Sequence, residues 1–365
     1  MKAAVLTTLN APLQILDVQQ EGPKHGEVRV KVKATGVCMS DWHLMIGDWP
    51  TKMPIVLGHE AAGIIEEVGP GVAKIKRGDH VIFSFRPHCG HCAYCSKGRS
   101  VLCVGHNDTP ATGLYDGTTR LKFNGESVNQ MSRIGTFGEY VVCSEENVVA
   151  IRKDMPWAQA ALVGCSVATG VGAVIRHAKV TAGASVVVIG CGGVGLNIVQ
   201  GARLAGARRI IAVDLLDNKL ALAKHFGATD SINAKTENVA KRVKEMTSGL
   251  GADYAFDAIG SQITATQVVD AIAPGGHAVL VGIPAMTVTA PISPFMMVFQ
   301  EKQLTGSFYG SVQPNLDFPL LCDLYMDKKL NLDDLISRTY KLDDINEGFA
   351  QLKTGSVARG VVMFD

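Results

Sequence analysis

Residues that can bind a metal ion gather in two segments of the first third of the chain. The first is Cys38-Met39-Ser40-Asp41-Trp42-His43 and the second is Gly58-His59-Glu60. They offer a thiolate, an imidazole, a hydroxyl and two carboxylates. A catalytic zinc ion usually takes three protein ligands of these types and leaves its fourth position to water or substrate. The two segments therefore predict part of a catalytic metal site, and a third ligand has to come from elsewhere.

Four further cysteines have the spacing of a closed metal site. Cys89, Cys92 and Cys95 recur at every third position, and Cys103 follows across a short basic loop. Four thiolates can enclose one tetrahedral ion and leave no room for substrate, so this ion would be structural. Two disulfide bonds are the alternative, which the tight spacing and a reducing compartment both disfavour.

A glycine-rich turn in the second half indicates a dinucleotide site. The continuous apolar run 185–189 predicts a strand buried on both faces, and Gly190-Cys191-Gly192-Gly193-Val194-Gly195 follows it directly, before a predicted helix. A second predicted strand, 209–213, ends in Asp214, 19 residues beyond Gly195, near the spacing of an acid that binds a ribose hydroxyl. The glycines would let the backbone approach a pyrophosphate at the helix N-terminus. A glycine-rich turn without a ligand is the alternative.

The elements around these residues predict two kinds of architecture. Residues 1–87 are expected to be β-rich and barrel-like, because 28–33 alternates apolar and basic residues and glycine turns follow. The second half alternates predicted helices (196–205, 218–226, 238–247, 264–272) with predicted strands (253–259, 277–281, 303–308). Such alternation is typical of a parallel, doubly wound sheet. The tail returns to mixed structure, and 360–364 is expected to form a strand that rejoins the first domain.

Length and composition limit the classes of function. A chain of 365 residues favours two domains, and 47% hydrophobic with 19% charged residues is ordinary for a globular protein. A net charge of +1 offers no electrostatic case for nucleic acid or an anionic membrane. The apolar runs 157–175 and 271–300 contain polar residues, glycines or prolines and are poor bilayer helices. The N-terminus lacks an apolar core long enough for a signal peptide. We therefore expect a cytoplasmic protein.

With Val163-Gly164-Cys165 as the source of a third ligand, the chain resembles the zinc-dependent medium-chain alcohol dehydrogenases over essentially its whole length. Gly58-His59-Glu60-Ala61-Ala62-Gly63 is similar to the zinc signature of that family, and the cysteine lobe and the turn 190–195 match its other motifs. The segments 115–120 and 135–140 resemble the liver-type, two-zinc branch. The resemblance implies an α/β chain with a GroES-like catalytic domain (1–166 and 311–365) and a Rossmann dinucleotide-binding domain (167–310).

The resemblance also implies roles for individual residues. Cys38, His59 and Cys165 would bind the catalytic zinc, and Cys89, Cys92, Cys95 and Cys103 the structural zinc, two ions per chain. Asp41 would orient His59, Glu60 would lie behind the metal, Ser40 would bind the substrate oxygen, and His43 would pass the proton to solvent. The implied cofactor contacts are Thr169, Gly190, Gly192, Gly193, Val194, Gly195, Asp214, Lys219, Ile283 and Arg359. The implied pocket wall consists of Trp49, Phe85 and Met131, with Ile283 beside them.

These residues favour hydride transfer between a small alcohol or aldehyde and NAD. Zinc would act as a Lewis acid on the alcohol oxygen. The acid at Asp214 would repel the 2′-phosphate of NADP, and Leu215 and Leu216 offer no arginine to hold one. Met39 replaces a basic residue that contacts the pyrophosphate in many liver-type members, and Arg359 is the remaining candidate for that contact.

Several alternatives stay open. Trp49 stands where glutathione-dependent formaldehyde dehydrogenases use acids, so an apolar or aryl alcohol is favoured over S-hydroxymethylglutathione. Polyol and sugar dehydrogenases often replace the third zinc cysteine by glutamate, unlike Cys165. A non-catalytic NAD-binding protein would be expected to lose ligands. The region around Val163 also resembles the nicotinoprotein branch, which keeps NAD tightly bound. The apolar stretch 294–299 is either core or, as in the liver-type branch, near the contact of a homodimer.

Overall fold

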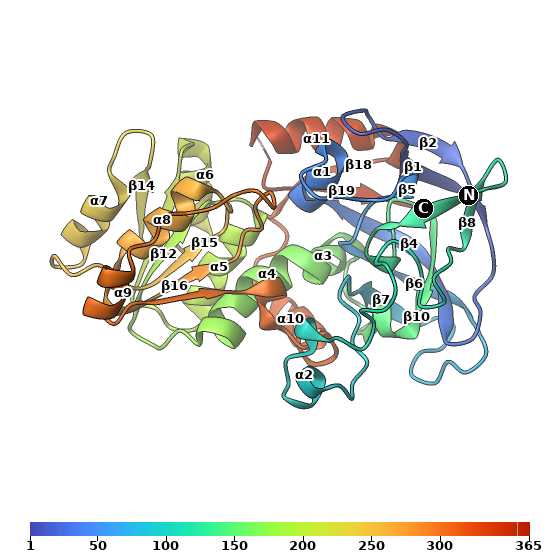
Figure 1. Ribbon diagram of the computed structural model, residues 1–365, viewed down its shortest axis with the longest axis horizontal. Coiled ribbons are helices and arrows are strands. Elements are labelled where there is room, and N and C mark those ends of the chain that lie inside the picture. Colours follow the sequence, from blue (N-terminus) through green and yellow to red (C-terminus); the bar gives the residue numbers. More distant parts are fainter. Residues whose placement is uncertain (356) are drawn as a thin grey trace. The chain divides into compact units, whose positions relative to one another are not determined.

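The computed structural model describes residues 1–355 and 357–365. These residues form two units: the first comprises Met1–Cys165 and Gln313–Asp365, and the second Ser166–Val312 (Figure 1).

The largest sheet of the first unit is built around the long strand β4 (Glu27–Val37). Val28, Val30 and Val32 are fully buried, and the intervening basic residues are less so, which confirms the strand predicted over 28–33. The sheet runs in the order β11 (Val148–Ile151), β7 (His80–Phe83), β6 (Ala61–Val68), β4, β19 (Arg359–Met363) and β18 (Ile336–Tyr340), with β10 (Tyr140–Ser144) also paired to β4. Antiparallel pairing of β19 with β4 brings the C-terminal segment back to the first unit, as predicted (Figure 1).

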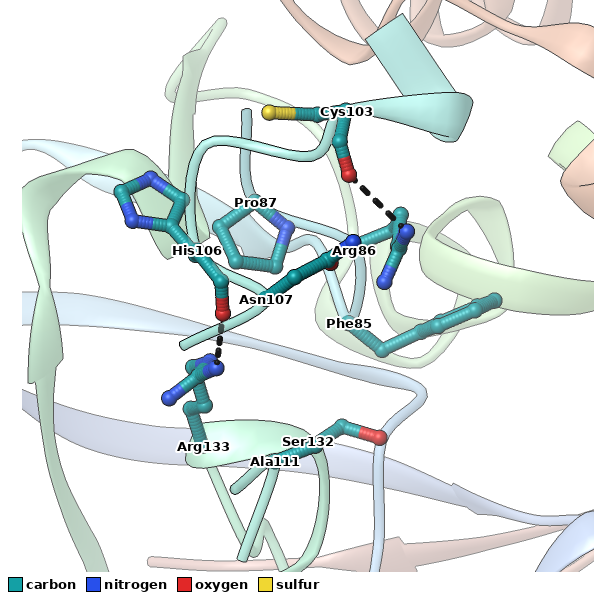
Figure 2. Close-up of a pocket in the computed structure, with 9 residues that line it drawn as sticks. All are labelled: Phe85, Arg86, Pro87, Cys103, His106, Asn107, Ala111, Ser132 and Arg133. Carbon is teal, nitrogen blue, oxygen red and sulfur yellow. Dashed lines mark hydrogen bonds between the residues drawn. The ribbon is translucent and has the colours of Figure 1, made fainter. Parts of the chain in front are cut away.

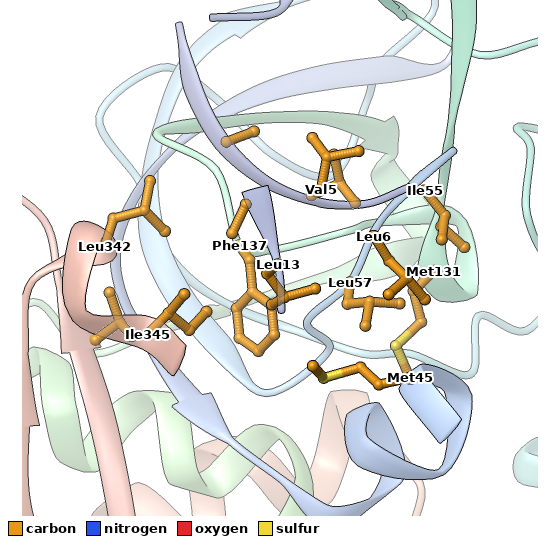
Figure 3. Close-up of a cluster of buried hydrophobic side chains, with 14 of the residues drawn as sticks. Val5, Leu6, Leu13, Met45, Ile55, Leu57, Met131, Phe137, Leu342 and Ile345 are labelled. Carbon is orange, nitrogen blue, oxygen red and sulfur yellow. The ribbon is translucent and has the colours of Figure 1, made fainter. Parts of the chain in front are cut away.

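A second sheet completes the β-rich part of the first unit. Its order is β2 (Gln14–Asp17), β1 (Lys2–Leu6), β5 (Ile55–Val56), β9 (Glu126–Gln130), β8 (Leu121–Phe123) and β3 (Gln19–Gln20). A core cluster that includes Val5, Leu6, Leu57 and Phe137 lies against it (Figure 3). Helices α1 (Met39–Ile46), α3 (Trp157–Leu162), α10 (Pro314–Met326) and α11 (Ile345–Thr354) belong to the same unit.

The second unit is a six-stranded parallel sheet, as predicted. Its order is β14 (Asp230–Asn233), β13 (Arg209–Asp214), β12 (Ser185–Ile189), β15 (Ala252–Asp257), β16 (Ile272–Leu280) and β17 (Gln303–Gly306). The accompanying helices are α4 (Ala168–Gly172), α5 (Gly193–Leu204), α6 (Asp217–His225), α7 (Val239–Met246), α8 (Gln262–Asp270) and α9 (Pro294–Phe299) (Figure 1). The chain order reverses between β12 and β15, and doubly wound sheets bind their ligands at such a point, beyond the carboxyl ends of the strands.

Several elements of the second unit differ from the prediction, and two of these differences have a local reason. β14 was not predicted, because Ile232 is its only large apolar residue. Helix α8 begins two residues before the predicted start at 264, since Ser261 and Thr264 form a capping box that satisfies its first backbone N–H groups.

The two apolar runs have different structures. Among the described residues, Trp157–Ala178 is long and apolar enough to cross a membrane, but 78% of its apolar window is buried within the structure. The run 271–300 contains strand β16 and the short helix α9. Phe295, Val298 and Phe299 of α9 are 70–79% exposed, whereas Met297 packs against a core cluster of the second unit, so the core interpretation of 294–299 holds for Met297 but not for these three residues.

Candidate active site

Cys38, His59 and Cys165 converge in the first unit. Their ligand atoms all lie within 4.8 Å of one another, and Sγ of Cys165 is 3.4 Å from Nε2 of His59. Two ligands of a tetrahedral zinc ion, at their usual bond lengths, are about 3.5 Å apart. All three side chains are buried, so the donor set and its spacing fit one zinc ion.

Local backbone structure presents each of these side chains. Cys38 directly follows β4 and is the N-cap of α1, and His59 lies two residues before the start of β6. Cys165 lies in a π-helical turn, η4 (Val163–Val167). Such turns widen a helix by one residue and are frequent at functional sites. The three ligands therefore come from two strand ends and one irregular helix.

Asp41 holds His59 in the orientation that metal binding requires. Oδ1 of Asp41 accepts from the backbone N–H of Gly58 at 2.9 Å and lies 3.2 Å from Nδ1 of His59. A proton on Nδ1 leaves the lone pair on Nε2, the atom that faces Cys165. Burial raises the pKa of the Asp41 carboxyl above its usual value, although His59 opposes the shift.

The buried ligands strongly influence one another's protonation. The hydrogen bond between the two thiols lowers the pKa of Cys38 well below its usual value and raises that of Cys165 well above it. Burial disfavours protonation of His59, yet the Asp41 carboxylate and the Cys38 thiolate raise the pKa of this imidazole well above its usual value. Concentrated negative charge of this kind suits a divalent cation.

Arg359 and Glu60 form a buried pair beside this cluster. Nη1 of Arg359 is 3.8 Å from Oε2 of Glu60, and both side chains are at most 5% exposed. Burial opposes the charge on the guanidinium, but Glu60 and the neighbouring cysteines raise the pKa of Arg359 above its usual range. Within the first unit, Arg359 is therefore engaged by Glu60 rather than presented on the surface.

The second cysteine cluster is also preformed for a metal ion. The sulfur atoms of Cys89, Cys92, Cys95 and Cys103 lie 3.5–4.0 Å apart in the contacting pairs, as expected for four thiolates around one tetrahedral ion. All nine cysteines of the chain are free, so the disulfide alternative is wrong. A Cβ atom at Gly105 would lie 2.6 Å from Sγ of Cys89, so only glycine lets the chain pass this close to the sulfur.

The thiols of this lobe are not equivalent. Hydrogen bonds from the backbone of Cys95 and Val104 lower the pKa of Cys92 to about 5, whereas burial raises that of Cys95 to about 12. Backbone N–H groups of Cys92 and Gly105 also point at cysteine sulfurs, at 3.4 Å. Such donors stabilise thiolates, the form that binds metal.

Two arginines that the sequence interpretation did not single out anchor the cysteine lobe and the segment that follows it (Figure 2). Arg86 donates to the carbonyls of Val101 and Cys103 at 2.8 and 3.1 Å. Arg133 donates to four carbonyls of the segment 106–113 at 2.7–3.1 Å. The hollow between them has a volume of about 40 Å³, which holds a water molecule rather than a substrate. A single arginine in a sequence gives no sign that its side chain will bind the backbone carbonyls of a distant loop.

In the second unit, the glycine turn and Asp214 lie side by side at the carboxyl ends of β12 and β13. Oδ2 of Asp214 accepts from the backbone N–H of Cys191 at 2.8 Å, and Oδ1 accepts from that of Leu215 at 2.8 Å. A Cβ atom at Gly195 would overlap the carbonyl oxygen of Gly190, so glycine is required for this tight turn into α5. A Cβ atom at Gly192, the N-cap of α5, would have no atom within 4 Å, so the start of α5 is open to an anionic group such as a pyrophosphate.

The other predicted cofactor contacts have different surroundings. Lys219 lies in the first turns of α6, Thr169 is 9% exposed in α4, and Ile283 is 47% exposed.

The three predicted pocket residues also have different surroundings. The ring of Phe85 packs edge-on against His59, with centroids 5.3 Å apart. Trp49 stacks on His43 at 4.8 Å. Met131 is 7% exposed and belongs to the core cluster of the first unit. Phe85 therefore lies against a metal-ligand candidate.

The first unit carries a three-ligand metal cluster, and the second is a doubly wound sheet of the kind that binds dinucleotides. This combination defines the class of metal-dependent oxidoreductases. The family model described as an alcohol dehydrogenase GroES-like domain matches residues 24–153, and that of a zinc-binding dehydrogenase matches 193–326. The chain is 40% identical to S-(hydroxymethyl)glutathione dehydrogenase of Paracoccus denitrificans, over 100% of this chain and 99% of that protein. It is also 40% identical to the NDMA-dependent alcohol dehydrogenase of Amycolatopsis methanolica, over 99% and 98%.

A solved structure, benzyl alcohol dehydrogenase from Acinetobacter calcoaceticus, matches with a TM-score of 0.94 and 33% identity, over 100% of this chain and 99% of that one. The chain belongs to the zinc-dependent medium-chain alcohol dehydrogenase family. It is an oxidoreductase whose family chemistry involves zinc and a nicotinamide cofactor.

Proposed function

We propose that the protein oxidises a primary or aryl alcohol to the aldehyde with NAD, and catalyses the reverse reaction, at a zinc ion held by Cys38, His59 and Cys165. The observation that carries this proposal is the buried three-ligand cluster with His59 oriented by Asp41. In this proposal 1–166 and 311–365 form the catalytic domain and 167–310 the dinucleotide-binding domain. The four-cysteine lobe would hold a second, structural zinc.

The chain's own residues would handle the proton and the charge. Bound zinc supplies a Lewis acid that makes an alcohol hydroxyl more acidic, and a nicotinamide supplies the hydride acceptor. Ser40, whose Oγ is 3.8 Å from Sγ of Cys38, would accept the substrate proton in a hydrogen bond and share it with His43, three residues further along α1. Glu60 and Arg359 would balance charge behind the metal.

NAD is proposed over NADP because of Asp214. Its carboxylate at the end of β13 would accept hydrogen bonds from a ribose diol and repel a 2′-phosphate. Lys219, Ile283, Thr169 and the turn 190–195 would complete the cofactor site. Mass analysis of cofactor released from the purified protein would distinguish an exchangeable NAD from a tightly bound one.

An apolar or aryl alcohol is the proposed substrate class. One similar protein is named for an aryl alcohol, as benzyl alcohol dehydrogenase, and another for a glutathione adduct, as S-(hydroxymethyl)glutathione dehydrogenase. Trp49 and Phe85 offer aromatic surface, which suits an aryl group better than a charged peptide. A steady-state comparison of benzyl alcohol with S-hydroxymethylglutathione tests this choice. A higher kcat/KM for the glutathione adduct would reverse it in favour of the second candidate function.

One assay separates the proposed activity from the other classes. Zinc content together with NADH formation is measured over a panel of alcohols, polyols and sugars. We expect two zinc ions per chain and activity with primary or benzylic alcohols. Activity confined to polyols would favour the polyol dehydrogenases, and zinc with no turnover of any alcohol would favour a non-catalytic NAD-binding protein.

A homodimer is proposed from the apolar surface of α9. Phe295 and Phe299 are stacked on each other at 5.5 Å while 70% and 73% exposed, and Met286 nearby in sequence is 75% exposed. Large apolar side chains exposed together are typical of a subunit interface. Light scattering of the intact protein should give about twice the chain mass, and Phe295→Ser with Phe299→Ser should lower it.

A further inference from the structure

The ring of His43 is held by two residues from the loop that follows its own helix. Nδ1 of His43 lies 2.6 Å from Oδ2 of Asp48. The indole of Trp49 stacks on the imidazole, with 4.8 Å between ring centroids and 25° between planes. The hydrogen bond to Asp48 fixes which edge of the ring faces the protein, and the stacking of Trp49 fixes the plane of the ring.

Asp48 reaches back to His43 because α1 ends at a left-handed glycine. Gly47 has φ of 83°, a conformation that glycine adopts without steric cost. The backbone N–H of Asp48 then donates to the carbonyl of His43 at 2.9 Å. The carboxylate contact therefore follows from the way the helix terminates.

The contact decides which ring nitrogen of neutral His43 is protonated. A carboxylate only accepts hydrogen bonds, so the proton is on Nδ1 and the lone pair is on Nε2. Among the residues that the structure describes, Nε2 has no hydrogen-bond partner, and Asp48 is the one charged group within ion-pair distance of the ring. The side chain of His43 is 20% exposed. Nε2 is thus left as a proton acceptor on a partly exposed side chain.

Helix α1 connects this ring to the metal-ligand cluster. Cys38 is the N-cap of α1, and Oγ of Ser40 is 3.8 Å from its sulfur. Ser40 and His43 are three residues apart, a spacing that places two side chains on the same face of a helix. The start of α1 therefore presents, in order, the metal-ligand candidate Cys38, the hydroxyl of Ser40 and the imidazole of His43.

We propose that Asp48 is a positioning residue for proton release, an inference that rests on the function proposed above. Oxidation of an alcohol breaks the C–H and O–H bonds; the hydride goes to the nicotinamide and the proton leaves the hydroxyl. In the neutral ring, Asp48 holds the proton on Nδ1 of His43, so that the lone pair on Nε2 can accept the proton. The carboxylate then pairs with the imidazolium until the proton passes to solvent, while Trp49 holds the ring plane.

The tautomer can be measured without any reaction. In ¹⁵N NMR of the zinc-containing protein at pH 8, we expect one neutral tautomer of His43, protonated on Nδ1, assigned by its loss in His43→Gln. Asp48→Asn should give a mixture of tautomers, because an amide can also donate to Nδ1. A wild-type ring protonated on Nε2, or an unchanged tautomer in Asp48→Asn, would overturn the proposal.

Kinetics test the consequence for turnover. General acid–base groups contribute about 10²–10⁴-fold, so we expect Asp48→Asn to lower kcat for benzyl alcohol by about 10-fold near pH 7, with a smaller effect on KM. Asp48→Glu should restore part of the rate, and Asp48→Asn should cost nothing further in the His43→Gln protein. An equal loss in that background would assign Asp48 a structural role. If the wild type oxidises no alcohol, the proposed function fails, and the NMR experiment still decides the tautomer.

Discussion

Sγ of Cys165 lies 3.4 Å from Nε2 of His59, although 106 residues separate the two in the chain. This contact completes the three-ligand cluster with Cys38. We expect Cys165→Ala to abolish alcohol oxidation and to reduce the zinc content from two ions per chain to one, because two remaining ligands bind zinc poorly.

Metal analysis of the purified variant checks this prediction. Cys143→Ala is the matched control, since Cys143 is equally buried and free but lies in neither cluster. The control should keep both ions. Two zinc ions in Cys165→Ala would refute the assignment of this ligand.

Asp214 is expected to set the choice between NAD and NADP. Asp214→Gly removes the carboxylate that would repel a 2′-phosphate, so the ratio of kcat/KM for NAD over NADP should fall by about 10-fold or more. The same substitution removes hydrogen bonds to Cys191 and Leu215, so the thermal midpoint is measured alongside. An unchanged NAD/NADP ratio in a folded variant would count against this role.

The buried ion pair of Arg120 and Glu27 is expected to contribute strongly to stability. Arg120 is 1% exposed and holds Glu27 with two hydrogen bonds, at 2.5 and 2.9 Å. Arg120→Met leaves a buried carboxylate without this partner, which costs about 3–5 kcal/mol. Urea unfolding of the variant should show a clearly lower midpoint.

Arg29→Met is the control for that substitution. Arg29 pairs with Glu66 and Glu67 at the surface, where its side chain is 32% exposed. Exposed pairs contribute about 0–1 kcal/mol, so this variant should unfold close to the wild type. Equal destabilisation by the two substitutions would contradict the importance of burial.

His277 is expected to make stability depend on pH. Burial lowers the pKa of this imidazole below the ordinary value of 6.5, and its Nε2 is hydrogen-bonded to Thr305 at 2.7 Å. The unfolded chain takes up the proton first as pH falls, so the contribution of His277 is present above pH 6.5 and is lost as pH falls through the folded-state pKa. His277→Gln should lose less stability than the wild type between pH 7 and 5.

Urea midpoints at pH 7 and pH 5 provide the measurement. The other groups around the ring are His177, which is also within hydrogen-bond distance of Thr305, and Tyr254. His225→Gln, at an exposed position, is the control and should follow the wild type. The same loss of stability in all three proteins would show that His277 does not carry this pH dependence.

Features whose geometry depends on neighbouring residues could be predicted from the sequence. The cysteine lobe spans 15 positions, and its ligands meet through short loops. The glycine turn follows a strand whose apolar run is unmistakable, and Asp214 ends the next one. Regular alternation of helices and strands was sufficient to predict the parallel sheet, because local periodicity reflects burial.

Contacts between distant segments required the tertiary structure. Cys165 depends on a π-helical turn that apolar periodicity does not reveal, and the pairing of Arg359 with Glu60 depends on β19 lying beside β4. The approach of Asp48 to His43 depends on how one helix ends. The sequence by itself determined the donor types and the two architectures, whereas the tertiary structure decided which side chains share a buried space, because that follows from packing across the whole fold rather than from spacing along the chain.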